Sequence, residues 1–113
     1  QDIFSKEKVS IWSDLPKRDF IFTEDAADAV LQLINTEYTG VLNLGTGEIN
    51  SIRNISKIIE NLSGKKIISE NKDVSGPLEF VTDITKIKNI IGWSPKYTLE
   101  EGLTKTFEIM KNY

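Results

Sequence analysis

The residue best suited to bind an anion is Arg18, which stands directly before an apolar run at residues 20–22. We expect that run to form a strand and to hold the arginine rigidly. A guanidinium carries a planar fork of donors that matches two phosphate oxygens at once. The residue types therefore allow a phosphate-binding arginine. They also allow a surface arginine, or one paired with Asp19 or a nearby glutamate, and the chemistry by itself favours this second interpretation.

Trp12 is the second residue with a chemical use. It ends a predicted strand at residues 9–12 and precedes a turn that contains Pro16. An aromatic ring at such a point could cover a nucleobase, or it could anchor the core. Trp93 lies between Gly92 and Pro95, and we interpret it as a packing residue.

A glycine pair at Gly45 and Gly47 follows another predicted strand, at residues 41–44. This arrangement resembles a phosphate-binding loop at first sight. A dinucleotide fingerprint, however, needs G-x-G-x-x-G running into a helix, and Glu48 follows here with no third glycine at that spacing. The pattern therefore indicates a tight turn between a strand and a helix.

Residue types that carry catalysis are scarce in this chain. Cysteine and histidine are absent, which excludes disulfides, thiolate zinc sites and histidine-based triads. Asp25 and Asp28 stand three apart on a predicted helix, and a helix N-terminus and solvent account for them. None of Tyr38, Tyr97 and Tyr113 is followed four residues later by a lysine. We expect no catalytic, cofactor-binding or metal-binding residue.

The elements that would position these residues alternate between short strands and amphipathic helices. A first helix starts at Thr23 as N-cap, with an apolar face of Ala27, Val30, Leu31 and Ile34. A second begins near residues 50–51 and ends before Gly64. A further strand is expected within residues 65–69, and residues 78–81 are expected to be extended.

Two more helices complete the chain. The third follows Asp83 as its cap and ends at Gly92, and the last opens with a capping box of Thr98 and Glu101. This order predicts an α/β (α+β) fold. Because the strands are few and short, we expect some apolar surface to require a partner outside this chain.

Size and charge limit the partners. The 113 residues carry 14 basic and 17 acidic side chains in an interspersed pattern, with a net charge of −3. This charge favours neither nucleic acid nor an anionic membrane as partner. No apolar stretch approaches the roughly 18 residues of a membrane span, and no signal peptide is visible, so a cytoplasmic protein is expected. The start at Gln1, without an initiator methionine, indicates a fragment of a longer polypeptide.

Several short motifs occur in a characteristic order. They are RDFIFTEDAA at 18–27, NLGTG at 43–47, SI at 51–52, DITK at 83–86, IGWSP at 91–95 and LEEGL at 99–103. Each is weak alone, but together the succession resembles the extended short-chain dehydrogenase/reductase family, and the agreement runs from about Ser10 to Phe107.

The resemblance implies an NAD-dependent or NADP-dependent enzyme that epimerises, dehydrates or reduces a sugar attached to a nucleoside diphosphate through transient hydride transfer. In that family an N-terminal Rossmann domain carries the glycine fingerprint and a Tyr-x-x-x-Lys pair, and neither occurs here. Residues 1–113 would therefore be the C-terminal nucleotide-sugar-binding domain without its Rossmann domain. The cofactor would bind to that missing domain, the isolated chain would be inactive, and the parent protein would be a homodimer.

Four residues receive substrate-binding roles from the resemblance. Arg18 matches the family arginine that binds the substrate pyrophosphate, and Trp12 stands where relatives place an aromatic beside the nucleobase. Ser13 replaces a glycine that is common next to it. Phe80 occupies a position that can face the substrate. A second pyrophosphate arginine of many relatives is lacking, and Lys72 could replace it as a point charge, which weakens an assignment to UDP-galactose 4-epimerase in particular.

Three functions remain open at this stage. The chain is the substrate-binding portion of a nucleotide-sugar epimerase or dehydratase, or a free-standing binding or regulatory module that lacks catalysis, or an interaction domain whose likeness to the family is accidental. The sequence favours the first. It does not identify the sugar, the base or the reaction subtype.

Overall fold

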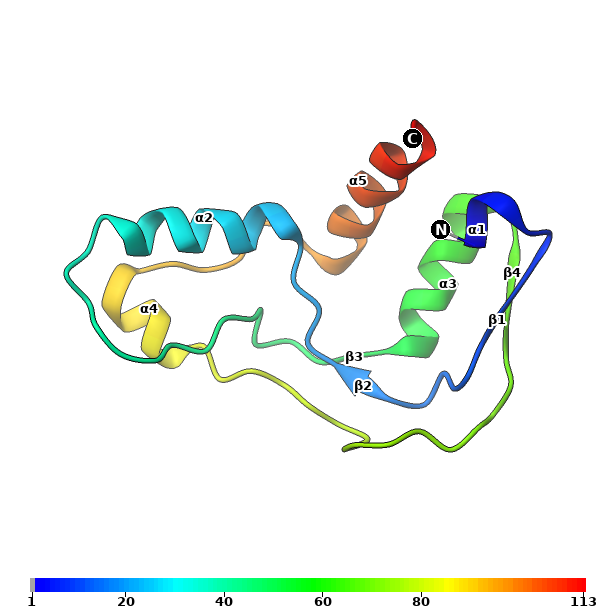
Figure 1. Ribbon diagram of the computed structural model, residues 1–113, viewed down its shortest axis with the longest axis horizontal. Helices are drawn as coiled ribbons and strands as arrows, with labels where there is room; N and C mark the ends of the chain where they lie inside the picture. The colour runs from blue at the N-terminus through cyan, green and yellow to red at the C-terminus, as the bar shows by residue number, and fades with distance from the viewer. Residues whose placement is uncertain (1) are drawn as a thin grey trace.

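The computed structural model describes residues 2–113, which form a flat, elongated body of 49 × 33 × 17 Å. Its elements alternate between helix and strand (Figure 1), which confirms the predicted α/β (α+β) class. They are α1 (Asp2–Ser5), β1 (Lys8–Ile11), β2 (Lys17–Arg18), α2 (Thr23–Ile34), β3 (Asn50–Ser51), α3 (Ile52–Ser63), β4 (Lys66–Ser69), α4 (Thr85–Ile91) and α5 (Leu99–Lys111).

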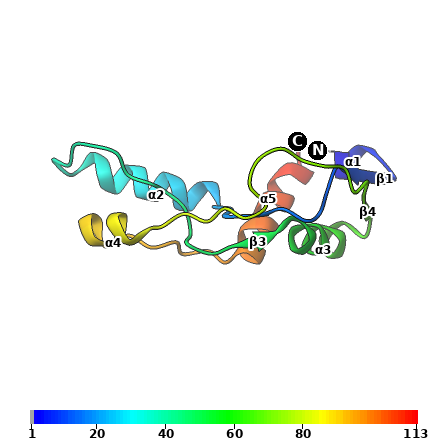
Figure 2. The same cartoon turned by 90° about the horizontal axis from the view of Figure 1, so that it is seen from below.

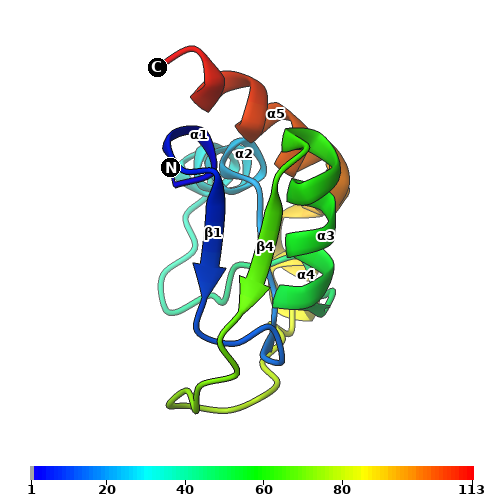
Figure 3. The same cartoon turned by 90° about the vertical axis from the view of Figure 1, so that its right-hand side faces the viewer.

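The longer sheet joins β1 to β4 in parallel, in a register that runs from Lys8 opposite Lys66 to Ile11 opposite Ser69. Figure 3 shows the two strands side by side, with α3 next to β4. Helix α3 begins where predicted, because the Ser51 side chain accepts the amide of Asn54, and it ends at Gly64 in the left-handed conformation (φ 71°).

The shorter sheet pairs β2 with β3 in the antiparallel sense, with Lys17 opposite Ser51 and Arg18 opposite Asn50. Arg18 thus lies inside a strand, whereas the expected strand at residues 20–22 does not form. The strand expected to mount Arg18 is therefore wrong, and the backbone of the arginine is instead paired with β3.

The predicted strand at residues 41–44 is also absent among the described elements. Its side chains still alternate between buried and exposed positions. Leu42 and Leu44 pack against the core, whereas Val41 is 82% exposed. A strand needs a neighbouring strand to accept and donate its ladder hydrogen bonds. No such neighbour exists within residues 2–113, so this prediction was wrong for the chain as it stands.

Helix α2 begins at Thr23 as expected, although Phe22 is its N-cap and Thr23 its first helical residue. Its expected apolar face is exposed, with Leu31 at 63% and Ile34 at 70%. The buried side of the helix instead carries Asp25 and Ala29. Figure 2 shows α2 and α4 together at the end of the flat molecule opposite β1 and β4.

Asp25 corrects the expectation that a helix terminus and solvent explain the α2 carboxylates. It is 1% exposed and accepts the amides of Lys96 (2.9 Å) and Tyr97 (3.2 Å). The Phe22 ring meets the Tyr97 ring edge-on at 5.0 Å beside it. Asp25 therefore ties the start of α2 to the turn before α5.

The core of the described chain is small. Its buried apolar residues are Ala29, Ile84, Ile87 and Trp93, so the predicted packing role of Trp93 is confirmed. The accessible surface is 7933 Å², whereas a monomeric protein of 12.8 kDa exposes about 6,300 Å². The radius of gyration of 16.2 Å likewise exceeds the roughly 13 Å expected for this length.

The last helix follows its predicted signal, whereas the cap predicted for the third helix was wrong, because Ile84 and not Asp83 is the N-cap of α4 and makes no side-chain capping bond. The Asp83 carboxylate accepts the amide and the hydroxyl of Thr85, at the start of α4. Thr98 and Glu101 form the expected capping box of α5. None of the helices described in residues 2–113 is both long and apolar enough to cross a membrane.

Candidate functional site

Arg18 points its guanidinium at backbone carbonyl oxygens. Its Nη1 donates to the carbonyls of Lys17 (2.8 Å) and Leu78 (3.2 Å). Within residues 2–113 it forms no ion pair with a carboxylate, so the alternative partners Asp19 and glutamate do not hold it. Since a guanidinium has five N–H donors, this half-buried side chain keeps donors for an anion.

Phe80 belongs to the segment that holds Arg18. The amide of Lys17 donates to the carbonyl of Leu78 (2.7 Å), and the amide of Phe80 donates to the carbonyl of Lys17 (3.1 Å). Lys17 also pairs with Glu79 through side chains at 3.1 Å. The Phe80 side chain is 56% exposed. The structure therefore brings Arg18 and Phe80 together on adjacent backbone segments.

Trp12 and Lys72 form a second pair. The amide of Lys72 donates to the carbonyl of Trp12 (2.8 Å), and its ammonium lies 5.7 Å from the centre of the indole ring. The ring is 66% exposed, so Trp12 is not a core anchor in this chain. Lys72 also pairs with Glu70, whose pKa is lowered by the hydrogen bonds from Lys72 and Ser10.

The pair of Trp12 and Lys72 does not contact the pair of Arg18 and Phe80, and only the intervening backbone connects them. Among residues 2–113 no hydrogen bond or ring contact links Trp12 or Lys72 to Arg18 or Phe80. Figure 1 shows that the segment after β4 passes β2 on its way to α4. The four expected residues therefore lie along one border, formed by the ends of β1 and β2 and by residues 70–80.

The turn at Gly45 and Gly47 is occupied by a side chain of the protein itself. The carboxylate of Asp19 accepts the amides of Thr46 (2.9 Å), Gly47 (2.9 Å) and Thr82 (3.3 Å), and also the Thr46 hydroxyl. Because these amides already donate to the Asp19 carboxylate, they are not available to bind the phosphates of a dinucleotide, and the turn does not fit such a ligand. This geometry agrees with the interpretation of residues 45–47 as a tight turn between two segments.

The Asp19 carboxylate is partly buried, which by itself raises its pKa. The hydrogen bonds from the Thr46 hydroxyl and from the three amides outweigh this effect and leave the pKa of Asp19 below its ordinary value of 3.8. Sequence reasoning missed this role. The only local signal was an acidic residue next to Arg18, because its partners lie 27 to 63 positions further along the chain.

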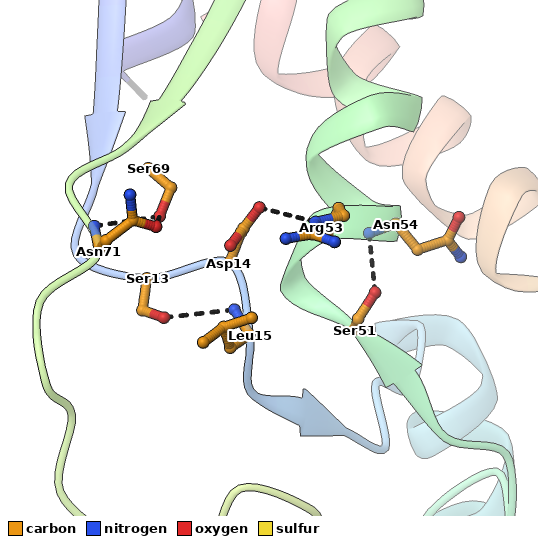
Figure 4. Close-up of polar contacts among 8 residues, drawn as sticks. All are labelled: Ser13, Asp14, Leu15, Ser51, Arg53, Asn54, Ser69 and Asn71. Atoms are coloured by element: carbon orange, nitrogen blue, oxygen red, sulfur yellow. Dashed lines mark hydrogen bonds and ion pairs between the residues drawn. The ribbon is translucent and has the colours of Figure 1, made fainter.

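A second polar cluster, also missed, lies where β1 and β4 end and α3 begins (Figure 4). Arg53 donates through Nε to Asp14 at 2.9 Å, and this hydrogen bond with its charge lowers the pKa of Asp14. Ser13 is buried, and its hydroxyl accepts the amide of Leu15. This cluster pins the turn that follows Trp12.

A cleft of about 330 Å³ lies elsewhere, between residues 20–23 and α5. Its lining includes Phe22, Tyr97 and Leu103 and none of the four expected substrate residues. At its edge the Tyr97 hydroxyl lies 3.1 Å from Lys105 and 2.9 Å from Glu24. The hydrogen bond with Tyr97 raises the pKa of Lys105.

No family model matches the chain. The chain does match individual proteins of known function. The chain is 33% identical over 113 residues to GDP-L-colitose synthase of Yersinia pseudotuberculosis, covering 95% of the chain and 36% of that relative. It is 32% identical over 108 residues to UDP-glucuronate 4-epimerase of Thermodesulfobacterium geofontis, covering 92% and 33%. The chain thus spans about a third of the length of the curated relatives it matches.

Solved structures also match nearly all of this chain and about a third of their own length. UDP-glucose 4-epimerase of Thermotoga maritima, crystallised with UDP-glucose, superposes with a TM-score of 0.87 at 27% identity, covering 98% of this chain and 37% of that one. UDP-glucuronic acid 4-epimerase of Bacillus cereus, in complex with UDP-glucuronic acid and NAD, gives 0.85 at 26% identity, covering 98% and 37%. The hexosamine 5,6-dehydratase TunA, at 21% identity, shares the fold with a TM-score of 0.88.

The match covers nearly all of this chain and the C-terminal part of each relative, as the order of motifs predicted. The homologues of this chain are therefore nucleotide-sugar epimerases and dehydratases of the extended short-chain dehydrogenase/reductase family, and the chain matches their C-terminal part.

Proposed function

We propose that this chain is the substrate-binding portion of an NAD-dependent or NADP-dependent enzyme that epimerises or dehydrates a nucleoside diphosphate sugar. It holds the nucleotide end of the substrate, while the remainder of the parent protein carries the cofactor and performs the hydride transfer. The chain on its own is non-catalytic in this proposal. The cytoplasmic location and the homodimeric parent remain predictions.

The observation that carries the proposal is the state of Arg18. Its guanidinium is fixed by backbone carbonyls and by the β2–β3 ladder, yet it has no carboxylate partner among the described residues. A half-buried cation in this state retains strong donors for a diphosphate. Support comes from the relatives crystallised with UDP-glucose and with UDP-glucuronic acid, which the chain matches along almost its whole length.

The other three residues take supporting roles. The exposed indole of Trp12 offers a flat face for a nucleobase, and the exposed ring of Phe80 lies on the segment that holds Arg18. Lys72 is already paired with Glu70 and stacked on Trp12. Its positive charge is therefore partly neutralised, and we assign it to the support of Trp12 rather than to a direct phosphate contact.

The exposed apolar face of α2 is the docking surface for the remainder of the parent protein. The face consists of Ala27, Val30, Leu31 and Ile34, and the unpaired segment 41–44 follows it along the chain. Relatives are about three times as long as this chain, so a large part of a relative is available to cover it. An exposed helix face of this kind is typical of an interface.

The test compares the only two arginines of the chain in the full-length parent protein. We expect Arg18→Ala to weaken binding of a nucleoside diphosphate by about 10- to 100-fold, because hydrogen bonds to a charged group contribute about 1.5–3 kcal/mol. Arg53→Ala removes the same charge from the cluster that holds the turn after Trp12, and it should weaken binding much less than Arg18→Ala does. Isothermal titration with UDP, dTDP, GDP and CDP measures both.

Equal affinity of the Arg18→Ala variant and the unmodified protein for every nucleotide would refute the role of Arg18. Tight binding of a nucleoside diphosphate sugar by residues 1–113 alone would instead favour the free-standing module. We expect only weak binding there, since the rest of the cleft lies outside this chain.

A further inference from the structure

The Asp19 carboxylate connects three segments that are distant in sequence. It follows Arg18 directly and accepts hydrogen bonds from the turn at Thr46 and Gly47 and from the amide of Thr82. The packing around it is tight, because a Cβ on Gly45 would lie 2.7 Å from the carboxylate and 2.6 Å from Thr82. All the groups that donate to it are neutral amides and a hydroxyl.

Segment 78–82 is held at both of its ends by the strand of Arg18. Lys17 binds its start through the backbone of Leu78 and Phe80, and Asp19 binds its end at Thr82. The Leu78 carbonyl in turn accepts the Arg18 guanidinium. The direction of the guanidinium therefore depends on a segment whose position depends on Asp19.

We propose that Asp19 is a positioning residue, which sets the direction of the Arg18 guanidinium by locking segment 78–82 and the Gly45–Gly47 turn to β2. Asp19 makes no contact with the substrate. The proposal rests on the proposed function, since it assigns a role in binding the same nucleoside diphosphate.

The experiment is a double-mutant cycle in the full-length parent protein. We expect Asp19→Asn to raise KM for the nucleotide sugar about tenfold, because small displacements of a binding group are costly, and to leave kcat within about twofold. In an Arg18→Ala background the same change should have almost no further effect on KM. A purely structural role would lower stability without this coupling, so that any effect of Asp19→Asn on KM would be independent of Arg18.

Thr46→Val provides a milder variant if Asp19→Asn fails to fold. It removes the hydroxyl bond to Asp19 and keeps the backbone amide and the shape of the side chain. We expect a smaller rise of KM, again abolished in the Arg18→Ala background. Asp83→Asn is the matched control, because Asp83 also accepts an amide and a threonine hydroxyl, at the start of α4, and its removal should leave KM unchanged.

The outcomes separate the two claims. If Arg18→Ala changes nucleotide binding but Asp19→Asn and Thr46→Val leave KM unaltered, or if their effects simply add to that of Arg18→Ala, the positioning role is wrong and the proposed function stands. If Arg18→Ala has no effect on nucleotide binding, the proposed function is wrong in the role it gives to Arg18. The positioning role of Asp19 is then wrong as well, because it acts through Arg18.

Discussion

Single carboxylates organise much of this chain. Asp19 fills the Gly45–Gly47 turn, Asp25 ties α2 to the turn before α5, and Asp14 holds Arg53 at the start of α3. Asp14 and Asp19, whose pKa values are lowered, accept these bonds as carboxylates, and such bonds are roughly twice as strong as neutral ones. A chain with so small an apolar core relies on these polar ties to connect its segments.

The lowered pKa of Asp19 predicts a pH dependence of stability. A carboxylate whose pKa is lower in the folded state stabilises the fold above its unfolded pKa, and this contribution is lost as the pH falls through the folded pKa. We therefore expect Asp19→Asn to be clearly destabilising at pH 7. The difference between the variant and the unmodified protein should shrink below about pH 4.

Urea unfolding of the full-length protein between pH 3.5 and pH 7 measures this difference. The comparison with Asp19→Asn isolates Asp19 from Asp14, Glu70 and Asp83, whose pKa values are also lowered. A difference in unfolding free energy that stays constant over this range would mean that the ionised carboxylate is not what stabilises the turn.

At the scale of elements, the short strands act as links rather than as a sheet that could stand alone. β2 and β3 contain two residues each, yet they place Arg18 opposite Asn50 and lead directly into α3. The turn between residues 44 and 48 approaches segment 78–82 so closely that Gly45 leaves no room for a side chain. Close approach, rather than phosphate binding, accounts for the first glycine of this turn.

This close approach predicts that Gly45→Ala is destabilising. The added Cβ would lie 2.6 Å from Thr82 and 2.7 Å from Asp19, so the backbone of one segment must move. Overpacking of this kind destabilises by about 1–3 kcal/mol. Gly76→Ala is the control, since no atom lies within 4 Å of its added Cβ and only its positive φ of 93° opposes the change. Thermal unfolding of both variants measures the two losses of stability. A smaller loss for Gly45→Ala than for Gly76→Ala would contradict the close approach at Gly45.

As a whole, the molecule exposes more surface than a monomeric protein of its mass. Its accessible area of 7933 Å² exceeds the about 6,300 Å² expected for its mass, and large apolar side chains such as Leu31, Ile34 and Val41 stand in solvent. The chain also spans only about a third of the length of its relatives. Burial by a partner surface would complete the core that Ala29, Ile87 and Trp93 begin.

A charge placed on the exposed face of α2 tests this conclusion. We expect Leu31→Lys to destabilise the full-length protein by about 1–3 kcal/mol, because the docked face would bury an unpaired ammonium. Glu37→Lys adds a lysine at an exposed position just beyond the same helix and serves as control. Equal melting temperatures for Leu31→Lys, Glu37→Lys and the unmodified protein would show that the face stays in solvent.

The sequence by itself determined the features that depend on neighbouring residues. The start of α3 near residues 50–51, the cap at Thr98, the helix ends at Gly64 and Gly92, and the order of family motifs were all predicted, because capping and helical spacing act within a few positions. The α/β class and the packing role of Trp93 follow from the same local patterns.

Only the tertiary structure decided which groups meet across the chain. The partners of Asp19 and Asp25 lie 27 to 72 positions away, and no local pattern marks them. The strand predicted at residues 41–44 needs a neighbour that residues 2–113 do not contain, since a ladder is a property of two segments and not of one. Local signals therefore describe the helices, whereas the site depends on contacts that exist only in the folded chain.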